Sequence, residues 1–160
     1  MKFVLLGDPV AHSKSPRMHA AAYRALGMNH TYEAVRVSAD EIGSWVDKLR
    51  RGEIGGINVT VPHKKVALEF ADEIATPIEA CNVLALKNGK VVAFNTDVPA
   101  LAEELGPAAS GTAIVLGRGG AARAAHEALK TLGATKIITR ARAGGDEPLT
   151  PTGSEKDARW

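Results

Sequence analysis

Cysteine, aromatic residues and long apolar runs are all scarce in this chain of 160 residues. The only cysteine is Cys81, which excludes an internal disulfide and is typical of a small core residue in a reducing compartment. Aromatic residues make up 4% of the chain, so Val, Ile, Leu and Ala must build the core. No apolar run approaches the length of a membrane span, and the run at the amino terminus is too short for a signal peptide. We therefore expect a cytoplasmic protein without membrane contacts.

Charge of one sign is not concentrated in any part of the chain. The formal net charge is +2, and 24% of the residues are charged. This mildly basic balance suits anionic small molecules, but no cluster of Lys and Arg is dense enough to indicate nucleic acid binding. The sequence shows no metal-ligand motif, so no metal is expected. The length allows one large domain, or one and a half small ones.

Short apolar runs alternate with turn residues over the first part of the chain. Strands are predicted at residues 3–6, 32–37 and 57–61, and helices within 15–27, 38–52 and 65–71. Ser15 is expected to cap the first helix, with Pro16 in its first turn. Asn88-Gly89, between apolar runs at 82–86 and 91–94, is a strong hairpin signal. The pattern predicts an α/β fold with a mostly parallel open sheet, a mixed edge and flanking helices.

A β-α-β unit is predicted after this sheet. A helix is expected at 99–105, strands at 113–116 and 136–139, and a second helix at 121–132. We interpret the unit as the incomplete start of a Rossmann-type domain, because a full dinucleotide fold has two β-α-β-α-β halves. The expected domains are a substrate domain at 1–98, the start of a dinucleotide-binding domain at 99–140 and an irregular tail at 141–160.

A glycine-rich turn joins the first strand of this unit to its helix. It fits the dinucleotide pattern G-x-G-x-x-A and contains Gly117, Arg118, Gly119, Gly120 and Ala121. Such glycines let backbone N–H groups approach a pyrophosphate at the positive end of the helix. About 20 residues further on stands Arg140 in place of an acidic residue, which favours NADP over NAD. The alternative is a tight turn whose glycines serve only packing.

Polar residues also gather where strands of the first domain should end. They lie at 12–16, 58–64 and 95–97, and include Ser, Thr, Asn, Lys and Asp. Ligands of open parallel sheets bind just beyond the carboxyl ends of strands. Each residue taken alone has an ordinary role as a helix cap or a strand-end hydrogen-bonding group. Together they indicate a site for a small polyhydroxylated acid.

These motifs together resemble the signature set of the shikimate dehydrogenases, in the same order, over about residues 2–140. They are Ser13-Lys14-Ser15-Pro16, the segment from Asn58 to Lys64, Asn95-Thr96-Asp97 and the glycine-rich turn. The resemblance implies reversible hydride transfer between NADPH and 3-dehydroshikimate to give shikimate, on the chorismate route to the aromatic amino acids. It leaves formation of a homodimer open.

The resemblance also implies roles for individual residues. Ser13 and Ser15 would hold the shikimate carboxylate. The ring hydroxyls would be bound by Thr60, Asn82 and Asp97, and the same loop would be supported by Asn58. Lys64 would be the catalytic residue, paired with Asp97. Lysine can move the proton that accompanies hydride transfer, or the pair can act as an electrostatic clamp on the developing alkoxide.

The family continues beyond Arg140 with the rest of its Rossmann sheet. We therefore expect a truncated member whose dehydrogenase activity is inherited by descent. One alternative is a catalytically incompetent shikimate-binding fragment or pseudoenzyme. Another is a quinate/shikimate dehydrogenase, which recognition of a single hydroxyl would decide.

Overall fold

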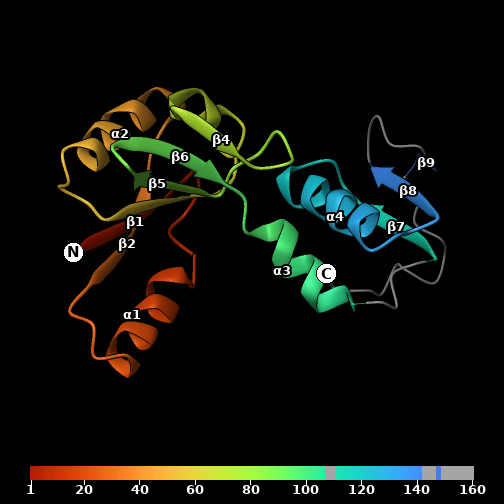
Figure 1. Ribbon diagram of the computed structural model, residues 1–160, viewed down its shortest axis with the longest axis horizontal. Coiled ribbons are helices and arrows are strands. Elements are labelled where there is room, and N and C mark those ends of the chain that lie inside the picture. The colour runs from red at the N-terminus through yellow and green to blue at the C-terminus, as the bar shows by residue number, and fades with distance from the viewer. Residues whose placement is uncertain (107–110, 142–146, 149–160) are drawn as a thin grey trace. The chain divides into compact units, whose positions relative to one another are not determined.

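A computed structural model describes residues 1–106, 111–141 and 147–148 of the chain (Figure 1). The chain divides into two units, Met1–Thr96 and a second that starts at Asp97. Within the described residues, no helix is both long and apolar enough to cross a membrane.

The first unit is built on a six-stranded sheet. Its strands are β1 (Lys2–Gly7), β2 (Thr31–Arg36), β3 (Gly56–Val59), β4 (Glu73–Ala75), β5 (Val83–Lys87) and β6 (Lys90–Phe94), in the order β2-β1-β3-β5-β6-β4. Parallel pairs join β1 to β2, β1 to β3 and β4 to β6, whereas β5 is antiparallel to both β3 and β6. Five strands thus run in one direction and only β5 opposes them. The predicted α/β fold with a mostly parallel sheet is confirmed.

The prediction that the mixed pairing lies at the sheet edge is wrong. The antiparallel strand β5 is internal, because β6 and then β4 continue the sheet beyond it. The strand β4 was not predicted, since all three of its residues are exposed and it has no apolar alternation. The hairpin was predicted correctly, because Asn88 and Gly89 have positive φ values of 52° and 77° in the turn.

Helices pack on the two faces of this sheet (Figure 1). The helix α2 (Ile42–Arg50) follows a 3-10 turn, η1 (Ala39–Glu41), which Ser38 and Glu41 cap reciprocally. The core between α2 and the sheet contains Ile42, Val46 and Leu49 from one face of the helix. The sheet contributes apolar side chains at alternate strand positions: Val4, Leu6, Ile57, Val59 and Leu84. The helix α1 (Ser15–Ala25) lies on the opposite face, where its His19 stacks on Tyr32.

Two local predictions on helices are corrected by the structure. Ser15 does not cap α1: Lys14 occupies the N-cap position, and Ser13 Oγ accepts the N–H of Ser15 at 3.2 Å. The helix expected at 65–71 is a 3-10 helix, η2 (Val66–Phe70). It ends early because Ala71 is already extended and Asp72 N–H donates to Val91 O in the sheet.

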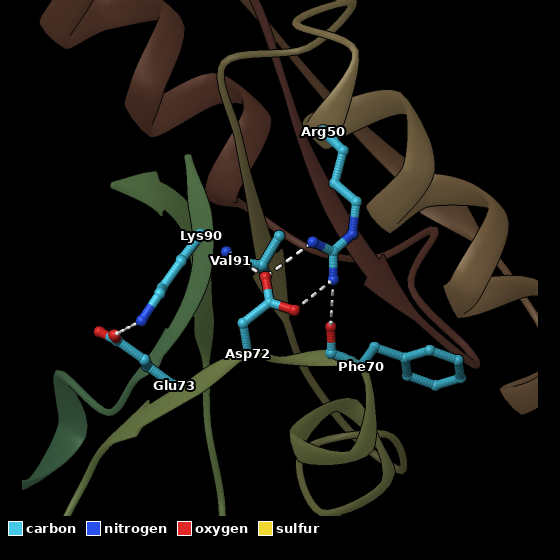
Figure 2. Close-up of polar contacts among 6 residues, drawn as sticks. All are labelled: Arg50, Phe70, Asp72, Glu73, Lys90 and Val91. Carbon is cyan, nitrogen blue, oxygen red and sulfur yellow. Dashed lines mark hydrogen bonds and ion pairs between the residues drawn. The ribbon is translucent and has the colours of Figure 1, made fainter. Parts of the chain in front are cut away.

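Asp72, the residue before β4, connects the end of α2 to the strand β6 (Figure 2). Its carboxylate accepts hydrogen bonds from Arg50 Nη1 at 2.7 Å, Arg50 Nη2 at 2.9 Å and Val91 N at 2.7 Å. These bonds, with that from Arg50 the strongest, lower the pKa of Asp72 from 3.8 to about 2. The neighbouring pair, Lys90 and Glu73, is a single exposed ion pair of 2.6 Å.

The low pKa of Asp72 predicts a loss of stability in acid. Because its pKa is lower in the folded than in the unfolded chain, the carboxylate stabilises the fold above pH 3.8. That contribution is lost as the pH falls from 3.8 towards about 2. We expect Asp72→Asn to unfold at lower urea concentration at neutral pH and to lose less stability than the parent protein on acidification.

The matched control for this variant is Glu73→Gln, which removes only the exposed pair with Lys90. Exposed ion pairs contribute little, so its urea midpoint is expected to stay near that of the parent. Equal midpoints for both variants at neutral pH would show that the bonds of Asp72 to Arg50 and Val91 do not stabilise the fold.

The second unit contains the predicted β-α-β unit. Its elements are α3 (Asp97–Leu105), β7 (Thr112–Leu116), α4 (Gly120–Thr131), β8 (Lys136–Ala141) and β9 (Glu147–Pro148). The three strands pair in parallel in the order β7-β8-β9. Val115, Ala122 and Leu129 form the core between α4 and the sheet. The strand β9 falls in the segment expected to be irregular, and the remainder of that segment after Ala141 lies outside the described residues.

Candidate functional site

Four segments of the first unit meet at one edge of its sheet, the edge formed by the carboxyl ends of β1, β3 and β6. The loops that follow β1, β3 and β6 start there, because these strands run in the same direction. The segment before β5 reaches the same edge because β5 runs the opposite way, with Val83 opposite both Asn58 and Phe94. The reversal of β5 therefore places Asn82 beside residues that follow the parallel strands.

The loops after β1 and β3 are joined to each other. Thr60 N–H donates to Leu6 O at 2.9 Å, and Asp8 N–H donates to Val61 O at 3.0 Å. A Cβ atom on Gly7 would collide with the Cγ2 methyl of Thr60. A glycine at this position is thus needed for the side chain of Thr60 to lie against the end of β1.

Lys64 lies in a turn held by a buried histidine. His63 is only 4% exposed, and its Nε2 lies 2.8 Å from Val37 O, to which it donates. The backbone N–H of His63 donates to Thr60 O at 2.9 Å. The next residue, the half-buried Lys64, accepts a bond from Cys81 N at its carbonyl, at 2.8 Å. Lys64 is thereby held next to the segment that carries Asn82.

Cys81 is a core residue, as its apolar flank predicted. Its side chain is fully buried. Burial raises the pKa of its thiol to about 11, although the charge of Lys64 acts in the opposite direction. A thiol that stays protonated is a poor nucleophile, so the structure gives Cys81 no chemical role.

Asn82 connects two strands and the residue Thr96 through its backbone and its side chain. Its N–H donates to Phe94 O at 3.0 Å, and its carbonyl accepts Val59 N at 2.9 Å and Asn58 Nδ2 at 3.1 Å. Its amide group bonds Thr96 twice: Nδ2 donates to Oγ1 and Oδ1 accepts the backbone N–H, both at 2.9 Å. The position of Asn82 is therefore defined by β3, β6 and the residue before Asp97.

Asn58 is held by both ends of its side-chain amide. Tyr32 donates its hydroxyl to Asn58 Oδ1 at 2.7 Å, and Asn58 Nδ2 donates to Asn82 O. The sequence did not single out Tyr32, because its partner lies 26 residues away and a tyrosine in a strand is unremarkable. His63 and Thr96 stand within the quoted motifs, but the sequence assigned them no role, because their contacts also join distant segments.

Ser13 and Ser15 lie at the amino-terminal end of α1, and both are half-buried. Ser13 N–H donates to Val10 O at 3.0 Å, which turns the chain so that Ser13 Oγ can accept the N–H of Ser15. The first turn of α1 contains no acidic residue. Two hydroxyl groups and the positive end of the helix dipole thus suit an anion.

Asp97 is the first residue of α3 and of the second unit. It directly follows Thr96, which the side chain of Asn82 holds at the edge of the first sheet. The predicted pairing of Lys64 with Asp97 therefore remains a prediction.

The glycine-rich turn lies between β7 and α4. Gly117 has a φ of 97°, and its N–H donates to Arg140 O at 2.8 Å, which brings the ends of β7 and β8 together. Among the described residues, and apart from the chain neighbours, no atom lies within 4 Å of the place that a Cβ would take on Gly117 or Gly119. Contacts with other described residues therefore do not require these glycines. The positive φ calls for glycine at Gly117, and the open backbone at Gly119 suits the close approach of a phosphate group.

The charges around this turn suit a dinucleotide with an additional phosphate. The turn itself carries Arg118 and leads through Gly120 and Ala121 into the first turn of α4, which has no acidic residue. Arg140 lies near the end of β8, opposite Leu116 at the end of β7. The residues present therefore fit NADP. Among the described residues, no group of His, Cys, Asp and Glu could hold a metal ion.

Known proteins resemble this chain in both sequence and structure. A family described as the shikimate dehydrogenase substrate binding domain matches residues 5–84. The shikimate dehydrogenase (NADP(+)) of Shouchella clausii is 37% identical over 151 residues, which is 89% of this chain and 55% of that protein. The crystal structure of shikimate dehydrogenase from Mycobacterium tuberculosis is 42% identical with a TM-score of 0.79, and covers 89% of this chain and 56% of that one.

The shikimate 5-dehydrogenase of Thermus thermophilus, solved in complex with NADP(H) and shikimate, has a similar fold. It is 37% identical with a TM-score of 0.80, over 89% of this chain and 56% of that chain. The chain thus spans about half the length of the relatives that it matches. The match over residues 5–84 and the shared fold of both units with these enzymes show that the chain belongs to the shikimate dehydrogenase family.

Proposed function

We propose that the protein acts as an NADP-dependent shikimate dehydrogenase, which interconverts 3-dehydroshikimate and shikimate. The observation that carries the proposal is the convergence of Thr60, Lys64 and Asn82 at one edge of the sheet, through bonds between their segments. A family member with these side chains at the expected edge has the groups that a polyhydroxylated acid requires.

Each part of shikimate has suitable partners in this proposal. Ser13 and Ser15 bind the carboxylate at the positive end of α1. The ring hydroxyls are bound by Thr60, Asn82 and Asp97. The two bonds from the Asn82 amide to Thr96 fix its orientation beside the proposed position of the ring. Asn58 supports this edge through Asn82 O.

Lys64 is the proposed catalytic residue. Oxidation of a ring hydroxyl requires removal of its proton, and reduction of the ketone requires delivery of a proton to the oxygen. The bond from Cys81 N–H to Lys64 O holds the lysine beside Asn82, which binds the ring. Asp97 would orient the ammonium group of Lys64 and the substrate hydroxyl.

NADP(H), when bound, supplies or accepts the hydride. The pyrophosphate would be held by Gly117, Gly119 and Gly120 with the backbone N–H groups of the first turn of α4. Arg140 and Arg118 would hold the 2′-phosphate, since both are cations near the turn.

Production of NADPH from NADP+ and shikimate tests the proposed function. We expect absorbance from NADPH to appear at a rate that saturates with shikimate and is lower with quinate. Saturable shikimate binding without NADPH would favour a binding module over an enzyme. If the protein neither bound shikimate nor formed NADPH, the proposal would be wrong.

Gly7→Ala is expected to weaken shikimate binding about tenfold, since the new methyl group must displace the side chain of Thr60 and its hydrogen bond to the substrate. Calorimetric titration with shikimate measures the effect. The control is Gly111→Ala, because none of the described residues other than its chain neighbours has an atom within 4 Å of a Cβ at Gly111. Unchanged affinity in Gly7→Ala would show that Thr60 does not bind the substrate.

A further inference from the structure

Tyr32 spans three strands of the first sheet. It lies on β2, opposite Phe3 of β1, whereas its hydrogen-bond partner Asn58 lies on β3, opposite Leu5 of β1. The bond from the Tyr32 hydroxyl to Asn58 Oδ1 therefore crosses β1, on the face of the sheet that carries α1. Tyr32 therefore connects β2, an outer strand of the sheet, to β3, the strand that leads into the candidate site.

The orientation of the Asn58 amide determines what the Tyr32 hydroxyl must do. Asn82 O can only accept hydrogen bonds, so Asn58 must turn its Nδ2 towards that carbonyl at 3.1 Å. Its Oδ1 then faces Tyr32, which must donate at 2.7 Å. If the amide turned over, two carbonyl oxygens would face each other. The hydroxyl of Tyr32 thus stabilises the single orientation of Asn58 that also holds Asn82.

Neighbouring rings hold Tyr32 in this donating position. His19 of α1 stacks on it with ring centroids 4.1 Å apart and planes inclined by 11°. Burial, assisted by the nearby Tyr23, raises the pKa of Tyr32 to about 12, so the hydroxyl keeps its proton at neutral pH. The ring is therefore positioned by α1, the helix whose amino-terminal end carries Ser13 and Ser15.

We infer that Tyr32 is a positioning residue for shikimate: its hydroxyl orients Asn58, and Asn58 holds Asn82 where its amide can reach the ring hydroxyls. This inference rests on the proposed function. It goes beyond that function because Tyr32 itself lacks a role in binding and acts through two other residues. Removing the hydroxyl should affect shikimate without affecting NADP+, whose proposed site lies in the second unit.

Tyr32→Phe tests this inference, with Tyr23→Phe as its control. Both changes remove one hydroxyl from the same cluster of rings, because the ring of His19, which stacks on Tyr32, also has its centroid 5.9 Å from that of Tyr23. Among the described residues, however, the hydroxyl of Tyr23 has no hydrogen-bond partner. We expect Tyr32→Phe to weaken shikimate binding about tenfold, as the loss of one partly buried hydrogen bond implies, and Tyr23→Phe to leave it unchanged. The affinity for NADP+ should be the same in both.

Hydrogen exchange between the Asn58 side-chain NH2 group and water, measured by NMR, gives a readout that does not depend on the substrate. Tyr32→Phe should accelerate it, whereas Tyr23→Phe should not. If the parent protein binds shikimate and the two variants bind it equally well, the inference is overturned. If the parent protein does not bind shikimate, the proposed function fails instead. The exchange rates then decide whether Tyr32 orients Asn58, and unchanged rates in Tyr32→Phe would show that it does not.

Discussion

Lys64→Ala is expected to lower kcat for shikimate oxidation by about 10²–10⁴-fold, the usual contribution of a general acid–base group. The affinity for shikimate should change by no more than about tenfold, since the ammonium group acts on the proton of the reacting oxygen rather than on the ground state. Steady-state kinetics with NADP+ and a separate calorimetric titration measure the two effects.

The neighbouring Lys65 offers a matched control. Lys65 is exposed and forms a 3.4 Å ion pair with Glu79, which is equally exposed. Lys65→Ala removes the same charge one residue away, so kcat is expected to remain near that of the parent. Near-normal turnover in Lys64→Ala would show that another group carries the proton.

Arg140→Asp is expected to weaken NADP+ binding by about tenfold to a hundredfold, because it removes a charge-assisted bond to the 2′-phosphate and adds a like charge. NAD+ lacks this phosphate, so its affinity should hold or rise. Titration of the protein with each cofactor measures the ratio of the two affinities.

Lys136→Asp is the control for this change. Lys136 is an exposed residue at the opposite end of β8, paired with Thr112 rather than with the end of β7. The same reversal of charge there should leave both affinities near their parental values. Equal losses for NADP+ and NAD+ in Arg140→Asp would indicate a disturbed fold and contradict the assigned role.

The elements that the sequence predicted well are those set by local chemistry. The hairpin follows from Asn88-Gly89, which adopt the positive φ values that its tight turn requires. The unit of β7, α4 and β8 follows from two apolar runs separated by a glycine turn and a helix. β4 could not be found in this way, because its exposed residues are ordered by pairing with β6 rather than by a pattern of their own.

The candidate site also combines features that were visible in the sequence with features that were not. The residue types at its edge were visible in the sequence, and the structure brings the segments of Thr60, Lys64 and Asn82 together. The bonds that hold them were not visible, because they join distant segments: His63 to Val37, and Tyr32 to Asn58. The cytoplasmic location and the homodimer remain predictions of the sequence.

The most direct test of the account is calorimetric titration of the purified protein with shikimate, repeated on the double variant Ser13→Ala/Ser15→Ala. These two hydroxyls flank the start of α1 and are assigned to the carboxylate, the only charged group of the ligand. We expect saturable binding at one site in the parent protein and loss of most of that affinity in the variant. Absence of shikimate binding in the folded parent protein, or equal binding in the variant, would contradict it.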